Sequence, residues 1–288
     1  MKTLLLLITL FFSQVACASA WRSGAIYDGQ TLQEASLQQV VDRSLQPGTV
    51  VVVSEQHDIL AHQQNQLRVL EALYTAGSDQ LSVGMEFFYR PSQPQVDQFV
   101  NGLLGEAEFL KTIEWGKAPF APYRPQVLFP AKHGGKTLAL NAPRSLTGRI
   151  SKVGIAGLTE AERAQLPPDF TLGNAAYFER FQEVMSGHIS KEALQRFFEA
   201  QSVWDETMAW TATEYLKQNP KQILVIIVGD FHAVYGGGLP DRLLARGAQN
   251  VVVVSQVHFD GVGENEAEKA MKPHEKWGPR ADYIWVNR

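Results

Sequence analysis

Six stretches of the chain are almost continuously apolar, and polar or turn-forming residues follow each of them. They are rich in Val, Ile and Leu and cover residues 48–57, 80–88, 136–144, 221–232, 250–257 and 281–287. Apolar residues that run on without alternation indicate strands covered on both faces, as parallel strands are. We therefore expect six strands, the last of them near an edge of the sheet.

Helical patterns separate these stretches. Residues 58–77 carry leucines near helical spacing, and Gly77 suits the position just past a helix end. Similar patterns predict helices at 92–105, 106–116, 157–167 and within 174–219. Pro220 ends the last of these helices, because proline disfavours helical backbone in the residue before it.

The alternation of strands and helices predicts an α/β fold. Its sheet is expected to be mostly parallel and covered by helices on both faces. Residues 156–219 hold no strand pattern, so we expect a helical insertion there that caps the edge or mouth of the sheet. With 45% hydrophobic and 19% charged residues, the composition is that of a globular chain, and residues 21–288 are expected to form one domain.

The first twenty residues predict export. A single Lys, an apolar core and then small residues make up a secretory signal peptide. Cleavage after Ala20 would release a soluble periplasmic protein, which the sequence favours. The alternative is a lipoprotein signal, "QVAC", which would lipidate Cys17 and hold the protein at the outer membrane. Gln14 fits that signal poorly. Cys17 is the only cysteine, so the mature chain has no disulfide.

Net charge excludes one class of partner. The formal charge is −4, which gives no basic field to hold nucleic acid.

Polar side chains follow four of the apolar stretches. The clusters are Ser54, Glu55, His57 and Asp58; Glu86 and Arg90; Asn141 and Arg144; and Asp230, His232 and Tyr235. The carboxyl ends of parallel strands share one edge of the sheet, where open α/β sheets bind ligands. A strand end that only turns the chain needs one turn residue, so four such clusters together predict a functional site.

The segment "GDFHAVYGGGLP" places an imidazole and a phenol just beyond a strand. Its three glycines, Gly236 to Gly238, allow positive φ and a close approach of the backbone to a ligand. A tyrosine can bind haem iron, and the nearby imidazole of His232 can accept the phenol proton of Tyr235. The alternative is that both side chains are buried and satisfy turn carbonyls. Tyr123, in "PFAPYRP", is a second candidate ligand.

The same clusters are also compatible with a metal site. Glu55, His57, Glu86 and His232 are residue types that bind zinc or iron. The two histidines follow different strands, so sequence spacing cannot show whether they meet.

Three further positions keep two interpretations each. Asp205 either orients a histidine or is exposed, and Arg144 can pair with a carboxylate of the protein or of a ligand. His62 and Gln66 lie four residues apart on one helix face, where a solvated or capping role is expected.

Taken together, these segments resemble the ChaN-like family of iron-regulated haem-binding proteins from bacterial haem-uptake loci. The matching blocks, in order, are "SEQHD…H…Q", "GMEFFYRPSQ", "LNAPR", "WDETMA" and "GDFHAVYGGGLP", and they span roughly residues 49–286. Ser54 departs from the glycine usual at its position. The resemblance implies a protein that stores or hands on haem in iron uptake, rather than an enzyme.

The resemblance also implies a site. Haem would be the cofactor, held as two stacked haems in a homodimer, with a tyrosine on each iron and His and Lys on the propionates. Tyr235 is then the expected iron ligand and Tyr123 the reserve. His57, His232 and Arg144 are expected to line the site. Lys132 and His133 are surface charges, or propionate partners by their chemistry alone. An outer-membrane haem receptor is the expected partner.

Two alternatives remain. "SEQH" and "GDFH" also resemble motifs of TraB/TIKI-type metallohydrolases and erythromycin-esterase-like proteins. There, Glu55, His57, Glu86 and His232 would bind a metal or act as a general base. The other alternative is an adaptor that docks on a receptor and binds haem only incidentally.

Overall fold

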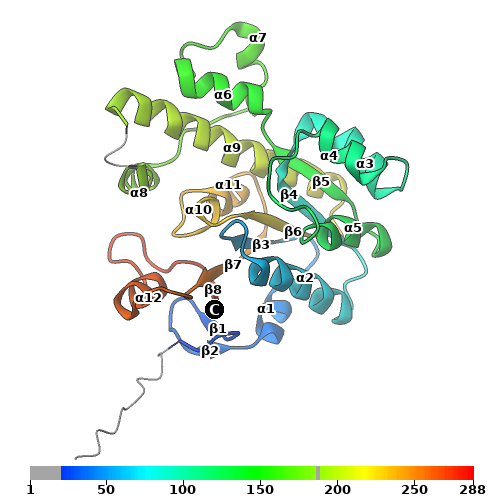
Figure 1. Cartoon of the computed structure of the whole chain (residues 1–288), viewed down its shortest axis with the longest axis vertical. Helices are drawn as coiled ribbons and strands as arrows, with labels where there is room; N and C mark the ends of the chain where they lie inside the picture. Colours follow the sequence, from blue (N-terminus) through cyan, green and yellow to red (C-terminus); the bar gives the residue numbers. More distant parts are fainter. Residues whose placement is uncertain (1–20, 186–188) are drawn as a thin grey trace, which may run out of the picture.

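A computed structural model describes residues 21–185 and 189–288 of the chain (Figure 1). Its eight strands form one sheet in the order β2-β1-β8-β7-β3-β6-β4-β5. The strands are β1 (Ile26–Asp28), β2 (Glu34–Ala35), β3 (Thr49–Glu55), β4 (Leu81–Tyr89), β5 (Thr137–Asn141), β6 (Ile223–Gly229), β7 (Asn250–His258) and β8 (Tyr283–Asn287). The predicted signal peptide and Cys17 lie outside the described residues.

Strands β3 to β8 are the six predicted from the apolar stretches, and they pair in parallel. β1 pairs antiparallel with both β2 and β8. The last strand, β8, was expected near an edge of the sheet, but it has a neighbour on each side. β1 and β2 were not predicted because they have only three and two residues, too few to show a period. The predicted α/β class with a mostly parallel sheet is confirmed.

Twelve α-helices accompany the sheet in the described part of the chain. They are α1 (Leu37–Ser44), α2 (Leu60–Thr75), α3 (Gln93–Val100), α4 (Glu106–Thr112), α5 (Arg124–Lys132), α6 (Arg144–Val153), α7 (Glu160–Arg163), α8 (Ala175–Met185), α9 (Lys191–Gln218), α10 (Asp230–Ala233), α11 (Leu239–Ala245) and α12 (Glu264–Met271). Helical patterns predicted α2, α3, α4, α7, α8 and α9, but not the others. None of the described helices is long and apolar enough to cross a membrane.

Both faces of the sheet are covered, which explains the continuous apolar runs. Along β3, Val51 and Val53 belong to a core with residues of α1, α2 and α5, whereas Val50 and Val52 belong to a second core with residues of α9 and α11. All four valines are fully buried. Residues on both faces of β3 therefore have to be apolar, because each face packs against a layer of helices.

Helix α9 links the expected insertion to the sheet. Its Met208, Ala209 and Ala212 pack on Leu224 and Ile226 of β6, so this part of α9 is a layer of the main fold. Residues nearer its start, with α8, extend toward the carboxyl ends of the strands (Figure 1). The segment therefore both covers one face and supplies side chains to the site described next.

Candidate functional site

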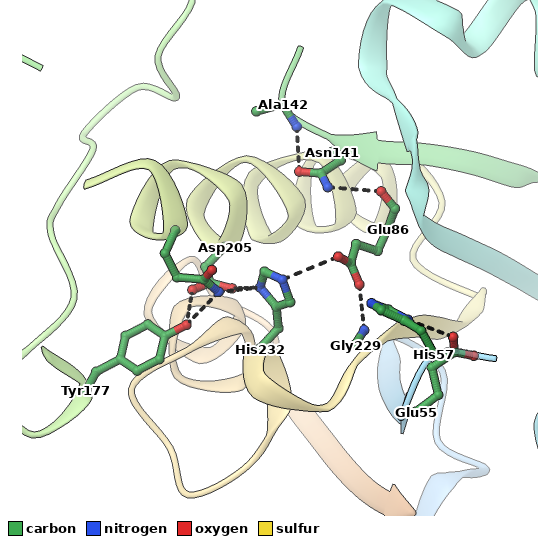
Figure 2. A network of polar contacts seen from close by, with 10 residues as sticks. Glu55, His57, Glu86, Asn141, Ala142, Tyr177, Asp205, Gly229 and His232 are labelled. Atoms are coloured by element: carbon green, nitrogen blue, oxygen red, sulfur yellow. Dashed lines mark hydrogen bonds and ion pairs between the residues drawn. The ribbon is translucent and has the colours of Figure 1, made fainter. Parts of the chain in front are cut away.

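The carboxyl ends of β3, β6, β4 and β5 lie side by side in the sheet. Residues in or just after these strands bring the side chains of Glu55, Glu86, Asn141 and His232 together, as Figure 2 shows from close by. We call the edge of the sheet formed by these strand ends the carboxyl rim.

His232 lies at the centre of this network. It sits on α10, the short helix that starts directly after β6, and is buried. Its Nδ1 is 2.6 Å from Oδ1 of Asp205, and its Nε2 is 3.3 Å from Oε1 of Glu86. Tyr177 donates a hydrogen bond of 2.7 Å to the other oxygen of Asp205. Asp205 therefore orients a histidine and is fully buried, which decides between its two interpretations.

The two carboxylates keep His232 charged. Burial opposes protonation, but the charges of Glu86 and Asp205 outweigh it and raise the pKa of His232 to about 10. Burial likewise acts to raise the pKa of Glu86, yet the charge and hydrogen bond of His232 lower it overall. The result is an ion triad, Asp205–His232–Glu86, in which one imidazolium lies between the fully buried carboxylate of Asp205 and the partly exposed carboxylate of Glu86.

A second histidine is paired with a second buried carboxylate. Nδ1 of His57 is 3.0 Å from Oε1 of Glu55. That carboxylate also accepts hydrogen bonds from Tyr123 Oη and Gln66 Nε2, both at 2.6 Å. The hydrogen bond to Glu55 raises the pKa of His57, with burial working against it. Because a carboxylate only accepts, Nδ1 carries a proton, and in the neutral form of His57 the other ring nitrogen, Nε2, keeps its lone pair.

Gly229 lies between the Asp205–His232–Glu86 triad and the Glu55–His57 pair. Its backbone N–H donates a 2.5 Å hydrogen bond to Oε2 of Glu86. A Cβ at Gly229 would lie 3.0 and 3.1 Å from Cε1 and Nε2 of His57. Asn141 supports the arrangement from β5 by donating to the backbone oxygen of Glu86 at 3.0 Å. His57 and His232, which follow different strands, are thus brought to the same carboxylate (Figure 2).

These residues are paired with one another rather than arranged as metal ligands. Among the described residues, no group of three or more His, Cys, Asp or Glu side chains is placed to hold a metal ion. The geometry therefore gives no support to the metal-binding form of the predicted hydrolase.

A cavity of about 400 Å³ opens beside Glu86. Aromatic side chains form much of its wall, and two cations and a further carboxylate also line it. The aromatic residues are Phe87, Tyr89, Trp115 and Trp204, and the charged ones are Arg144, Lys117 and Glu114. His57 meets the Phe87 ring edge-on, with 5.4 Å between ring centroids. The predicted residue Arg144 is exposed here and forms no ion pair within the described residues.

Tyr235 lies at another part of the rim, next to β7 and β8. Its φ is 59°, and Gly236 and Gly237 follow with 69° and 76°, so three successive residues are left-handed. A non-glycine residue in this conformation costs on the order of 1 kcal/mol or more and persists only where the surroundings hold it. Arg280 does so: its backbone oxygen accepts from Tyr235 N at 2.8 Å.

Arg280 connects Tyr235 to the strand ends. Its guanidinium pairs with Asp230, and its Nη1 lies 3.4 Å from Tyr235 Oη. Burial opposes the charge of Arg280, but Asp230 outweighs it and the pKa is raised. Asp230 also accepts from Ser54 Oγ at 2.6 Å and from Ser255 Oγ at 2.9 Å. Ser54, the departure from the usual glycine, therefore contributes a hydrogen bond to this cluster.

Two more residues beside Tyr235 were not predicted. The rings of His274 and Trp277 stack on each other with centroids 3.9 Å apart, and they lie 6.2 and 5.9 Å from the Tyr235 ring. Both belong to the loop between α12 and β8. The sequence analysis looked for site residues after strands, and this loop follows a helix. The only signal in the sequence that could have pointed to the loop is its density of ring-bearing and charged residues.

The other predicted residues lie elsewhere. Tyr123 is buried, with its phenol bonded to Glu55. Lys132 and His133 end α5 at the opposite edge of the sheet, where His133 O accepts from Leu81 N at the start of β4. They do not join the rim cluster.

His62 and Gln66 are fully buried, so the expected solvated role was wrong. Nδ1 of His62 accepts from Gln56 N at 3.0 Å, and burial lowers the pKa of His62 to about 4. Gln66 supports Glu55 directly.

Comparison with known proteins connects this arrangement to one family. Residues 41–243 match the profile of the family described as haem-binding uptake, Tiki superfamily, ChaN. The solved structure described as "Cofacial heme binding to ChaN of Campylobacter jejuni" is similar, with a TM-score of 0.67 at 18% identity over 90% of this chain and 95% of that one. The type III effector HopBA1 has a TM-score of 0.50 at 11% identity over 88% and 93%. No curated protein matches the chain.

Proposed function

The chain belongs to the ChaN family of haem-binding uptake proteins, and from that premise we propose that it stores haem or hands it on during bacterial iron acquisition. Haem is accordingly its cofactor, as the sequence resemblance implied. The observation that supports a particular site is the phenol of Tyr235.

The surroundings of Tyr235 suit an iron ligand. Ferric haem, when bound, would supply an iron that a tyrosine oxygen can ligate. The Tyr235 ring is only half-buried, and its turn is held in a costly left-handed conformation. The guanidinium of Arg280 stands beside the oxygen, where it would face the negative charge of a ligating phenolate. The stacked rings of His274 and Trp277 supply aromatic surface of the kind a porphyrin packs against.

The remaining predicted cofactor residues take lesser parts in this proposal. His57 and Arg144 are accessible on the same rim. His232 and Tyr123 are buried below it, where His232 pairs with Glu86 and Tyr123 donates a hydrogen bond to Glu55. Lys132 and His133 lie at the far edge of the sheet, so we assign them to propionates only as residues supplied by a second copy of the chain.

Haemin titration tests the Tyr235 assignment. We expect wild-type protein to bind haemin saturably with a ferric tyrosinate spectrum. Tyr235→Phe should bind at least about tenfold more weakly, a loss of about 1.4 kcal/mol, and lack those bands. Tyr74→Phe, which changes an exposed tyrosine on α2, is the matched control. An unchanged tyrosinate spectrum in Tyr235→Phe would reject the ligand.

Export and a receptor partner complete the proposal. The first twenty residues support secretion to the periplasm, or an outer-membrane anchor if Cys17 is lipidated. The uptake class supports an outer-membrane haem receptor as donor. The mass of the mature N-terminus separates the two forms: a chain that starts at Trp21 excludes the anchor.

A further inference from the structure

A buried arginine lies against the glycine-rich turn that carries Tyr235. Arg180 belongs to α8, in the helical insertion, and it is only 4% exposed. α8 follows no strand, so the pattern of polar residues at strand ends does not point to this side chain. Its contacts nevertheless connect the insertion directly to the proposed haem ligand.

The guanidinium of Arg180 is bonded to the backbone of the turn. Its Nη1 donates to the carbonyl oxygens of Val234 and Gly236, the latter at 3.0 Å, and its Nη2 donates to that of Phe231 at 3.2 Å. These carbonyls lie on both sides of Tyr235 in the chain. One side chain therefore ties the residues before Tyr235 to the residue after it, and so holds the left-handed backbone between them.

The turn has little bulk where α8 packs on it. A Cβ on Gly237 would lie 2.7 Å from Cβ of Tyr177, which is on the same helix as Arg180, so a larger residue would push the helix away. Gly237 also has a φ of 76°, which a residue with a side chain rarely adopts. The sequence suggested that the glycines allow a ligand to come close, but at Gly237 the close neighbour is α8.

Holding a turn does not require a charge. Arg180 makes no ion pair within the described residues, and its Nε has no hydrogen-bond partner among them. Arg242, which is also buried, pairs with Glu206 at 2.5 Å. A neutral amide could donate to the carbonyls of the turn without the cost of taking a cation out of water. The charge of Arg180 therefore needs a reason beyond the turn.

That charge faces the ring of Tyr235. Cζ of Arg180 lies 5.9 Å from the centre of the ring, and Cζ of Arg280 lies 5.5 Å from it. Arg280 is already paired with Asp230, whereas Arg180 has no carboxylate in contact. A tyrosine that ligates iron carries the negative charge of a phenolate. Tyr235 as a ligand would therefore supply the negative charge that the surroundings of Arg180 lack.

We propose that Arg180 is a positioning residue for Tyr235: it fixes the turn that presents the phenol, and its charge stabilises the phenolate on the iron. This rests on the proposed role of Tyr235 as the haem ligand. Arg180 would not touch the iron and would act only through Tyr235. The helical insertion thereby gains a part in haem binding, because Arg180 comes from α8.

Hydrogen–deuterium exchange of the haem-free protein tests whether Arg180 holds the turn. The amides of Val234, Tyr235 and Gly237 donate hydrogen bonds of 3.1, 2.8 and 2.7 Å. These amides should be protected in wild-type protein. They should exchange at least about tenfold faster in Arg180→Gln, because hydrogen bonds from a charged donor are lost. Exchange in β3 and β6 should stay the same.

Arg163→Gln is the matched control. Arg163 lies in α7, is exposed, and also donates to backbone carbonyls, those of Ile155 and Ala156. This variant should leave both the exchange of the turn and the binding of haemin as they are in wild-type protein. Thermal unfolding shows whether each variant is folded.

The reduction potential of the bound haem tests the role of the charge, which a purely structural role would not move. A positive charge beside the ligand favours the reduced iron, because reduction lowers the positive charge of the metal. Arg180→Gln should therefore lower the potential by about 59 mV, which is a tenfold change in the equilibrium constant of a one-electron couple. The same variant should bind haemin about tenfold more weakly.

Two exchange results would overturn the positioning role: turn amides that exchange in wild-type protein as fast as in an unfolded peptide, or equal rates in wild type and Arg180→Gln. The first needs no variant, so it applies even if Arg180→Gln does not fold. An unchanged potential would overturn the role of the charge. A wild-type haemin spectrum without tyrosinate bands would reject Tyr235 as the ligand and the role of the charge with it. The exchange rates, measured without haem, would still decide whether Arg180 holds the turn.

Discussion

At the scale of single residues, the structure places the imidazolium of His232 between two carboxylates, in one of the polar clusters that the sequence predicts at the strand ends. His232 sits between Asp205 and Glu86, which come from α9 and β4, and neither carboxylate is near it in the chain. Such a triad holds three segments together only while all its members are present, because removing one leaves an uncompensated buried charge.

Asp205→Ala should therefore destabilise the fold by about 3–5 kcal/mol, the range for breaking a buried pair. Denaturant unfolding measures the loss. Glu214→Ala, which removes an exposed pair with Lys217 on the same helix, should change little. Equal effects of the two substitutions would contradict the ion triad.

The pH dependence of stability follows from the same residue. The pKa of His232 rises from 6.5 to about 10 on folding. Its stabilising contribution is therefore complete below pH 6.5 and is lost as pH rises toward 10. We expect the free energy of unfolding to fall across this window in wild-type protein, and less so in His232→Gln. Chemical denaturation at several pH values tests this, and parallel curves for the two proteins would refute it.

At the scale of elements, the junction between β6 and α10 decides how closely the two histidines approach. Gly229 ends β6 with ordinary extended backbone, so its small size rather than its flexibility matters there. His57 occupies the space that a side chain would need.

Gly229→Ala should displace His57 while the haemin spectrum stays intact. The reason is the 3.0 Å separation between an added Cβ and Cε1 of His57. Gly148→Ala is the matched control, because it lies in α6 with no atom within 4 Å of the added carbon. Crystal or NMR evidence that His57 keeps its position in Gly229→Ala would contradict this account.

At the scale of the whole molecule, one sheet edge carries two separate groups of side chains. The strand order puts β7 and β8 on one side of β3, and β6, β4 and β5 on the other. The residues around Tyr235 (Asp230 and Arg280) and those around His57 (Glu55 and Glu86) therefore lie side by side on the carboxyl rim.

A dimer is expected when haem is bound. The resemblance of the sequence to the ChaN-like family implies a homodimer that holds two stacked haems. Sedimentation velocity with and without haemin should show a monomer that becomes a dimer, or a dimer that haemin tightens. A monomer in both conditions would exclude this arrangement.

The sequence by itself determined the layers of the fold. Runs of valine, isoleucine and leucine predict strands covered on both faces, and Val50 to Val53 of β3 show why: consecutive residues face different helical layers. The parallel pairing then sends the polar residues that follow each strand to one edge. Short elements such as β1 and β2 escaped prediction because two or three residues carry no period.

Only the tertiary structure decided which polar residues act together. Asp205 could have been exposed, but the path of α9 turns it onto His232. His62 lies on a helix face that packing seals, and Arg280 reaches Asp230 and Tyr235 from fifty and forty-five residues away in the chain. Lys132 and His133 lie at the amino ends of the strands, away from the carboxyl rim, for the same reason. Secondary structure follows local periodicity, whereas side chains from distant segments meet only where the packing of whole elements brings them together.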